Sequence, residues 1–496
     1  MSPLTAIFSG VPLFATYAQL PSHFFTSVQP NPVAHPELFS ANLQLAAELG
    51  ISPADLMSSE TISVLAGNSI PGHSTPIAMA YAGHQFGHFV PQLGDGRAIL
   101  LGEVAGKTGQ LWDIHLKGAG QTQFSRQGDG RAPLGPVIRE YVVSEAMHAL
   151  GIPTTRALAA IKTGEVVYRE TPLPGAIIAR VAKSHIRVGT FQYFAAHSDI
   201  DGVRTLADFA IQRIYPEFKI HNTPYSALLH KVIDRQAQLV AKWMCVGFIH
   251  GVMNTDNTSI SGETLDYGPC AFLDHYDPDA VFSAIDRHGR YAYNQQPQVM
   301  AWNMARFAET LLPILNHDPA AALIEAEAAV AHFFPSCQAY WLATMRQKLG
   351  LLTPLEQDKT LIEGLLTLMA KSKADFTITF RSLDQTASGD PTLTLAHIGA
   401  NSDAKDWVRN YQNRIKEEPY SLEKILATMH QVNPVYIPRN HQIQAIIDRA
   451  IHQSDFTAMS LLNTVLANPF APQPQNSEFE TPPSDDERIT QTFCGT

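Results

Sequence analysis

The sequence of 496 residues has few cysteines and no long apolar run. Its four cysteines form no C-x-x-C pair, so we expect a reducing compartment and no disulfide framework. No stretch approaches the roughly 20 apolar residues that cross a bilayer, which excludes a membrane-spanning helix. Residues 1–14, MSPLTAIFSGVPLF, contain no basic residue, so neither a secretory signal nor a mitochondrial presequence is expected. We therefore expect a cytoplasmic protein with no membrane partner.

Positive charge is also scarce. Asp and Glu total 46 against 35 for Lys and Arg, a formal net charge of −11. A general nucleic-acid binder needs a basic face, so we expect no nucleic-acid partner. The chain is long enough to bury one large core or several smaller ones, and we expect a monomer.

The organisation of the chain follows from where strands and helices are predicted. Residues 1–80, with Pro21, Pro30, Pro32 and Pro36, predict an extension that wraps around the rest. Residues 81–203 predict two strands, a helix and two more strands, with a turn at 105–109 between the first two. These elements are Arg97–Val104, Leu111–Lys117, Val137–Leu150, Glu165–Arg169 and Ala176–Ala182.

Helices are predicted to dominate residues 204–470. An amphipathic stripe from Leu228 to Met244 runs directly into a polar loop at 250–268. Residues 471–496 are rich in Pro, Ser, Asp and Glu, which predicts a mobile tail. Further helices are expected at Gln298–Leu312, Pro319–Phe333, Ser336–Leu349, Thr360–Ser372, Ala404–Lys416 and His441–His452.

The polar loop carries the residues best suited to phosphate chemistry. Asp256 and Asn257 are followed by Asp266-Tyr267-Gly268, and such oxygen ligands suit a divalent cation beside phosphate groups. The spacing from His250 to Asn257 resembles the H-R-D-x-x-x-x-N loop of protein kinases, and Asp266-Tyr267-Gly268 resembles D-F-G. Val252 stands where a kinase has its base. The loop alone therefore leaves open an inactive kinase or a different phosphate enzyme.

Cationic residues before this loop exceed what a kinase needs for phosphates. Gly94-Asp95-Gly96-Arg97 combines glycines, which let backbone amides approach a phosphate, with an arginine. Lys117 ends the next strand, where a kinase keeps the lysine that pairs with a helix glutamate. Glu140 is the preferred partner over Glu145, which we place on another face. A basic glycine-rich loop at 123–131 and two arginines, Arg180 and Arg187, add further anion ligands.

Together these segments closely resemble the selenoprotein O family, in its bacterial form. The resemblance implies an α+β, protein-kinase-like fold of two lobes: a mixed-sheet N-lobe with one key helix, and a mainly helical C-lobe. It also implies a protein adenylyltransferase, which transfers AMP from ATP, bound in a flipped orientation, to Ser, Thr or Tyr hydroxyls and releases pyrophosphate. Uridylyl transfer with Mn²⁺ is a further implied activity. The matching segments are YAGHQFGHFVPQLGDGRA (81–98), HLKGAGQTQFSRQGDGRAPLGPVIREY (115–141), ARVAKSHIRVGTF (179–191) and HGVMNTDNTSISGETLDYGP (250–269).

The resemblance also assigns roles to residues. Asp256 is the implied proton acceptor, Lys117 pairs with Glu140, and Asn257 and Asp266 are the implied ligands of Mg²⁺ or Mn²⁺. Cys494, two residues before the end, has the placement of a redox cysteine, and Cys270 is its candidate partner. The implied nucleotide-binding residues are Gly94, Gly96, Arg97, Lys117, Asp129, Gly130, Arg180, Arg187 and Asp266.

Two alternatives remain beside adenylyl transfer. An ordinary phosphotransferase would move the γ-phosphate instead, and Val252 and the surplus of arginines count against it. A pseudokinase scaffold would bind ATP and transfer nothing, but the retention of Lys117, Asp256, Asn257 and Asp266 counts against that.

Overall fold

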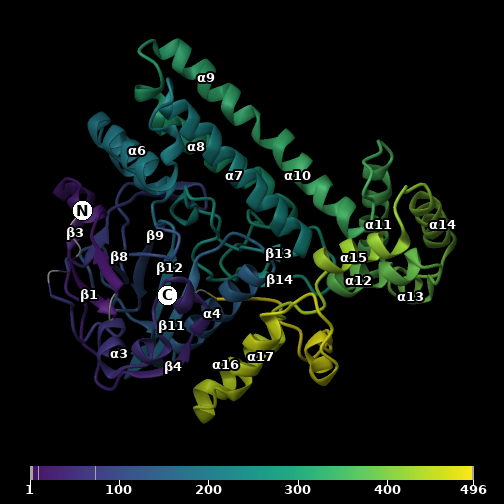
Figure 1. Ribbon diagram of the computed structural model, residues 1–496, viewed down its shortest axis with the longest axis horizontal. Helices are drawn as coiled ribbons and strands as arrows, with labels where there is room; N and C mark the ends of the chain where they lie inside the picture. The colour runs from purple at the N-terminus through teal and green to yellow at the C-terminus, as the bar shows by residue number, and fades with distance from the viewer. Residues whose placement is uncertain (1–3, 9–10, 73, 494–496) are drawn as a thin grey trace.

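The computed structural model describes residues 4–8, 11–72 and 74–493. It is an α+β structure in which an antiparallel sheet lies beside a larger body of helices (Figure 1). The α+β class is therefore confirmed, while the two-lobe, protein-kinase-like arrangement stays a prediction. None of the described helices is both long and apolar enough to cross a membrane.

The main sheet follows the path β1-β2-β8-β9-β12-β11-β4, and neighbouring strands along this path are antiparallel. Its central strands are β8 (Ala98–Ala105), β9 (Leu111–Lys117), β11 (Arg156–Tyr168) and β12 (Pro172–Ala182). Strands from the first 80 residues extend the sheet on both sides. On one side β4 (Glu37–Ala41) pairs with β11. On the other side β2 (Val11–Phe14) and β5 (Ile77–Met79) pair with β8, and they pair in turn with β1 (Leu4–Phe8) and β3 (Phe25–Ser27). The remaining short strands are β6 (Gly83–Gln85), β7 (His88–Val90), β10 (Ala132–Pro133), β13 (Phe248–Ile249) and β14 (Ala271–Phe272).

The register of β9 against β12 places two cations on one face. Lys117 lies opposite Ile178, and His115 lies opposite Arg180. Because side chains alternate between faces along a strand, Lys117 and Arg180 project to the same side. Helix α4 (Leu134–Ala149) packs on that side, with Ile178 in its core.

The other face of the sheet is covered by the N-terminal region. Ile177, Ala179 and Val181 of β12 pack there with Leu45, Leu56 and other residues of the first 70 positions. The short helices of this region are α1 (Leu43–Glu48), α2 (Pro53–Leu56) and α3 (Ser59–Leu65). Each begins at an Asn or Ser whose side chain accepts a hydrogen bond from the third residue along, satisfying a free helix amide.

The helices after the sheet form two groups. The first shares a core with α4: α5 (Val188–Ala196), α6 (Ile200–Ile214), α7 (Pro224–Val246), α8 (Gln296–Leu315), α9 (Pro319–Ala331), α16 (Asn440–Gln453) and α17 (Thr457–Leu466). A separate core, on the right in Figure 1, is built by α11 (Asp358–Ser372), α12 (Phe376–Ala387), α13 (Thr392–Ile398), α14 (Ser402–Lys416) and α15 (Leu422–Val432). Helix α10 (Phe333–Lys348) joins the two groups.

The chain also contains short 3-10 turns, η1 to η6. They are η1 (Tyr17–Gln19), η2 (Ser22–Phe24), η3 (Pro216–Phe218), η4 (Thr255–Asn257), η5 (Tyr293–Gln295) and η6 (Pro474–Glu480).

Most predicted elements agree with the structure. The strands predicted at 97–104 and 111–117, the helix at 137–150 and the six later helices all exist, with ends shifted by a few residues. The strand predicted at 165–169 covers only the end of β11. This strand begins at Arg156 and pairs with β12 along its length in a long hairpin. Helices α2, α3, α5, α6, α12, α13, α15 and α17 were not predicted individually.

Residues 471–493 contact the rest of the protein, and their predicted mobility stays a prediction. Tyr436 accepts a hydrogen bond from the amide of Gln473, and Thr492 forms a bridge with Ser283. The Thr492 hydroxyl is buried and donates to the carbonyl of Pro269 at 2.7 Å. Although the composition of the tail is polar, its backbone and hydroxyl groups form hydrogen bonds with residues of the preceding chain, including Tyr436 and Pro269.

Candidate active site

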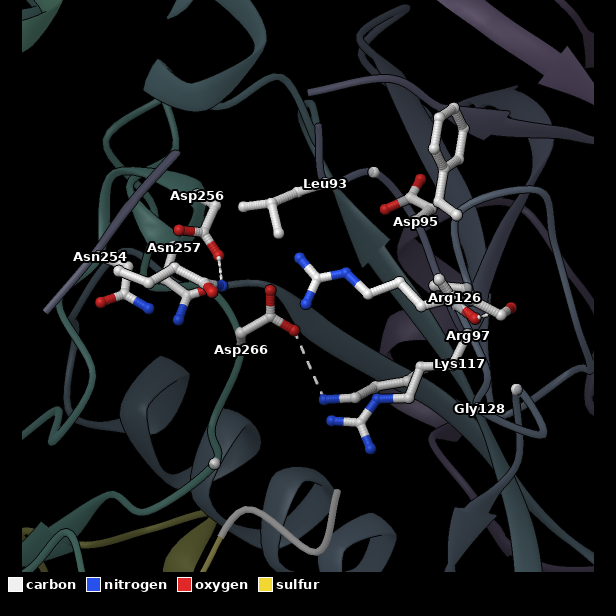
Figure 2. A pocket seen from close by; sticks show the side chains of 18 of the residues that line it. Leu93, Asp95, Arg97, Lys117, Arg126, Gly128, Asn254, Asp256, Asn257 and Asp266 are labelled. Carbon is white, nitrogen blue, oxygen red and sulfur yellow. Dashed lines mark hydrogen bonds and ion pairs between the residues drawn. The ribbon is translucent and has the colours of Figure 1, made fainter. Parts of the chain in front are cut away.

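A pocket of about 820 Å³ lies between the sheet and the loop at 250–268. Asp256, Asn257 and Asp266 lie on one side of it, and Arg97, Lys117 and Arg126 lie opposite (Figure 2). All predicted nucleotide and metal residues, and Asp256, line the pocket. Glu140 is buried behind it, in contact with Lys117.

The loop that carries the acidic residues is held by buried polar contacts. Helix α7 ends at Gly247, whose left-handed φ of +73° turns the chain into β13. The imidazole of His250 is hydrogen-bonded to the carbonyl of Leu265 at 2.9 Å, which ties the start of the loop to its end. Asp266 itself has a left-handed φ of +62°, a strained conformation for a residue other than glycine. Strain at this position is maintained by the partners of its carboxylate.

Asp266 is the meeting point of three cations. Its Oδ1 lies 2.5 Å from Arg180 and 3.4 Å from Lys117, and its Oδ2 lies 2.5 Å from Arg187. Glu140 neutralises two of these cations from the other side: its carboxylate lies 2.7 Å from Lys117 and contacts Arg180. Burial alone would raise the pKa of Asp266, but the three positive charges outweigh it and hold the pKa well below its usual range.

Arg187 connects the acidic residues to the glycine-rich motif. Besides Asp266, it donates to the backbone carbonyl of Asp256 at 2.5 Å, and it lies 3.9 Å from Asp95. Its guanidinium stands 4.8 Å from the ring of Tyr81, a cation–π contact. Arg187 is also the N-cap residue of α5. The N-terminus of this helix therefore lies at the site, and its dipole favours negative charge there.

Asp256 differs from Asp266 because no cation of the described residues forms an ion pair with its carboxylate; Arg187 binds its backbone carbonyl instead. Its Oδ2 accepts a hydrogen bond from Gln85 at 3.1 Å, and its buried Oδ1 has no partner among the described residues. Burial raises the pKa of Asp256 to about 6, with Gln85 and Arg187 opposing the shift. A carboxylate with a pKa close to neutrality is suited to accept a proton.

The donor set fits a divalent cation. Asn257 donates through Nδ2 to the carbonyl of Val252 at 3.1 Å, so its side-chain oxygen is the atom left for a ligand role. Within residues 4–8, 11–72 and 74–493, no group of three or more His, Cys, Asp and Glu side chains is arranged around a metal position. Mg²⁺ usually takes one or two protein carboxylates and completes its shell with water and substrate phosphates. Asn257 and Asp266 would therefore hold the ion together with a nucleotide.

The glycines of the predicted loops are needed for close approach. Gly94 has a φ of +119°, and a Cβ there would lie 2.3 Å from the ring of Phe124. Gly130 has a φ of +68°, and its Cβ would lie 2.0 Å from the carbonyl of Gly120. Asp129 is half-exposed and bound by Arg169 at 2.8 Å, at the outer end of the pocket.

Comparison with known proteins assigns the chain. The family model described as protein adenylyltransferase SelO matches residues 11–467. The chain belongs to the SelO family. A protein nucleotidyltransferase YdiU of Bradyrhizobium sp. (strain BTAi1) is 55% identical over 98% of this chain and 99% of its own length. Proteins of the same name in Methylorubrum extorquens and Rhizobium meliloti are 53% and 52% identical over 99% and 97% of this chain, and over 100% and 98% of their own lengths.

Membership of the SelO family makes the chain a nucleotidyltransferase. The resemblance inferred from four short segments is therefore confirmed over nearly the whole chain. The pairing of Lys117 with Glu140 rather than Glu145 agrees with the structure, since Glu145 binds Arg156 instead. The chemical roles of the site residues stay predictions.

Three pocket residues of this SelO chain were missed as site residues. Gln85, Tyr81 and Asp95 all occur in the segment at 81–98, but no spacing rule gives them a task. Asp95 is buried and accepts from the amide of Met79 at 3.1 Å, while His115 lies 3.3 Å away. Their contribution depends on contacts with residues far away in the sequence.

Of the two cysteines in the predicted redox pair, only Cys270 is among the described residues. Cys494 lies outside the described residues, so its pairing with Cys270 stays a prediction, to be checked by counting thiols under oxidising conditions. Cys270 is buried beside Pro269, the residue whose carbonyl binds the Thr492 hydroxyl.

Proposed function

We propose that the protein is an adenylyltransferase that transfers AMP from ATP to Ser, Thr or Tyr hydroxyls of other proteins. The observation that carries the proposal is the convergence of Lys117, Arg180 and Arg187 on Asp266, beside a carboxylate of different character at Asp256. These three cations face two carboxylates, Asp266 and Glu140, so one positive charge remains in the group, which suits a departing polyphosphate. The naming of the family model and of the YdiU relatives supports the same activity.

In this proposal ATP lies flipped relative to its orientation in kinases. Lys117, Arg180 and Arg187 hold the β- and γ-phosphates, which leave together as pyrophosphate. Arg97 and the glycine-rich segments at Gly94, Gly96 and Gly130, with Asp129, contribute the rest of the nucleotide site. The α-phosphate is then left facing Asp256.

The proposed transfer moves one proton and exchanges one P–O bond. Asp256 accepts the proton of the acceptor hydroxyl, whose oxygen forms a bond to the α-phosphorus. The bond from the α-phosphorus to the bridging oxygen breaks, and pyrophosphate leaves with the electron pair. Mg²⁺ or Mn²⁺ held by Asn257 and Asp266 would supply charge neutralisation at the phosphates.

The test uses ATP labelled in turn at the α- and γ-phosphate, with Mg²⁺ or Mn²⁺ and a protein acceptor. Adenylyl transfer predicts label from α-ATP and pyrophosphate release, and intact mass distinguishes an added AMP from a phosphoryl group. Asp256→Ala and Lys117→Ala should abolish labelling. Labelling from γ-ATP would favour an ordinary phosphotransferase, and ATP binding with no label a pseudokinase. A parallel reaction with UTP and Mn²⁺ tests uridylyl transfer.

A further inference from the structure

A β-hairpin packs against the carboxylate of Asp256. It consists of β6 (Gly83–Gln85) and β7 (His88–Val90). Gln85 binds Oδ2 of Asp256, and a Cβ on Gly83 would lie 2.6 Å from Oδ1, so both carboxylate oxygens face this hairpin. An acceptor hydroxyl that reaches Asp256 must therefore arrive beside the hairpin.

The hairpin is fixed to the loop that it covers. The amide of His84 donates to the Thr255 hydroxyl at 2.7 Å, and the amide of Phe86 donates to Asn254 at 3.1 Å. Phe86 has a left-handed φ of +51° at the turn, which these bonds maintain. The hairpin and the proton acceptor thus form one unit, and the surface next to the hairpin is next to the reaction.

That surface is formed by arginine and aromatic side chains. The guanidinium groups of Arg290 and Arg306 lie 4.9 Å and 5.0 Å from the ring of Trp302 on α8. His84 stands edge-on to Trp302 at 5.0 Å and contacts Phe89 at 4.9 Å. Phe89 is 41% exposed. We call these five residues the arginine–tryptophan surface.

This surface carries positive charge that the described residues do not fully neutralise. Arg306 pairs with Glu309, whereas the guanidinium of Arg290 forms no ion pair with a carboxylate of the described residues; of the groups of Arg290, only its backbone amide donates to Asp286. The Nε atoms of both arginines are buried without a hydrogen-bond partner among the described residues. The pKa of His84 is lowered mainly by burial and further by both arginines, in line with positive charge there. In a chain of net charge −11, such a local surplus stands out.

The nucleotide does not account for these residues. The pocket is lined by Arg97, Arg180 and Arg187, while Arg290, Trp302 and Arg306 lie outside its lining. Arginine and tryptophan are the residues that most often dominate binding at protein interfaces, and arginine binds carboxylates with paired hydrogen bonds. These features suit a protein acceptor rather than a second part of ATP.

We propose that the arginine–tryptophan surface docks an acidic segment of the acceptor protein and so brings its hydroxyl to Asp256. The inference rests on the proposed transfer to protein hydroxyls and adds the chemical class of the acceptor. Carboxylates near the target hydroxyl bind Arg290 and Arg306, and an apolar neighbour packs on Phe89 and Trp302. Charge complementarity of this kind selects among partners.

The experiment compares three short synthetic peptides that share one Ser, Thr and Tyr and differ only in flanking residues: Glu, Gln or Lys. With the full-length enzyme, ATP and Mg²⁺ or Mn²⁺, the Glu peptide should have the lowest KM. Arg290→Glu and Arg306→Glu should each raise that KM roughly tenfold and leave the KM for ATP unchanged. Arg409→Glu, on α14 with a 68% exposed side chain, is the matched control and should have no effect.

Binding of the fluorescently labelled Glu peptide, followed by anisotropy without ATP, separates this inference from the proposed function. If the Glu peptide binds, Arg290→Glu abolishes this binding and no peptide receives AMP, the docking surface is supported and the proposed AMP transfer is refuted. Transfer with equal KM for all three peptides, or unchanged KM in both variants, would overturn the docking surface. Arg290→Gln, with its melting curve, provides the second variant should the charge reversal fail to fold.

Discussion

Buried charge is the organising feature of the site at the scale of single residues. Lys117, Arg180, Glu140 and Asp266 form a compensated group in which each side chain neutralises two others. Removing one member of such a group leaves an uncompensated charge, which costs roughly 3–5 kcal/mol in buried pairs. The arrangement is therefore sensitive to single substitutions that conserve shape.

Glu140→Gln is expected to impair both stability and catalysis. It removes the carboxylate that binds Lys117 and Arg180, so we expect a loss of roughly 3 kcal/mol of unfolding free energy. Misplaced cations should lower AMP transfer roughly 100-fold. Urea unfolding and transfer rates measure the two effects. Glu145→Gln, on another face of α4 and paired with Arg156, is the control and should leave the transfer rate close to that of the wild type.

Glu263→Gln tests a buried acid outside the cation group. Burial raises the pKa of Glu263 to about 7, above its ordinary value of 4.5, against the opposing effects of Lys183 and Ser261. The folded state therefore holds the proton more tightly, and this stabilisation is complete below pH 4.5 and lost as the pH rises to about 7.

Gln does not titrate and can accept the same hydrogen bonds from the Ser261 hydroxyl and the Lys183 amide. Relative to the wild type, Glu263→Gln should gain up to about 3 kcal/mol between pH 4.5 and pH 8. Denaturant unfolding across this range measures the difference. A constant difference at every pH would contradict the raised pKa.

At the scale of elements, the β6–β7 hairpin and η4 depend on close packing. Gly83 and Gly189 both approach the residue that carries the proposed base, since Gly189 would place a Cβ 3.3 Å from the Cα of Asp256. Side chains larger than hydrogen at these positions must displace Asp256 or the hairpin. We therefore expect that packing at Gly83 and Gly189 mainly positions Asp256 and contributes less to the stability of the fold.

Gly83→Ala should reduce transfer while the protein stays folded. The added methyl would lie 2.6 Å from Oδ1 of Asp256, and moving the carboxylate should lower kcat roughly 100-fold. The melting temperature should fall by only a few degrees, because one short hairpin is affected. Gly364→Ala on α11, away from the pocket, is the control and should keep full activity.

At the scale of the whole molecule, the C-terminal tail reaches a segment beside the pocket. The amide of Thr492 donates to Phe282 at 2.7 Å, and the amide of Ala284 donates to Thr492 at 3.2 Å. Ile285, directly after this segment, lines the pocket and is 63% exposed. The end of the chain thus supports one rim of the site.

A truncated chain that ends at Glu480 tests whether the tail orders this segment, because it lacks Thr492. Without Thr492, the amide of Ala284 loses its acceptor and should exchange with deuterium faster than in the full chain. Exchange in α7 should be unchanged. Phe493→Ala, which removes an apolar side chain that is 66% exposed and leaves Thr492 in place, is the control. Equal exchange at Ala284 in both chains would show that the tail does not order this segment.

The sequence by itself determined the local elements and the chemical types. Apolar-rich segments at 97–104 and 111–117, joined by a turn, specify strands. A helical stripe specifies α7, and the motifs specify the family. These features are encoded by neighbours in the chain, because side-chain periodicity and turn residues act over a few positions.

Only the tertiary structure decided which distant residues meet. Gln85 binds Asp256, which is 171 residues away, and His84 packs against Trp302, whose position differs by 218 (302 − 84). The contacts of the tail arise in the same way: Thr492 is hydrogen-bonded to Pro269 and Phe282, which no local pattern reveals. Hydrogen bonds and charges act through space, so their partners are fixed by packing and register rather than by spacing along the chain.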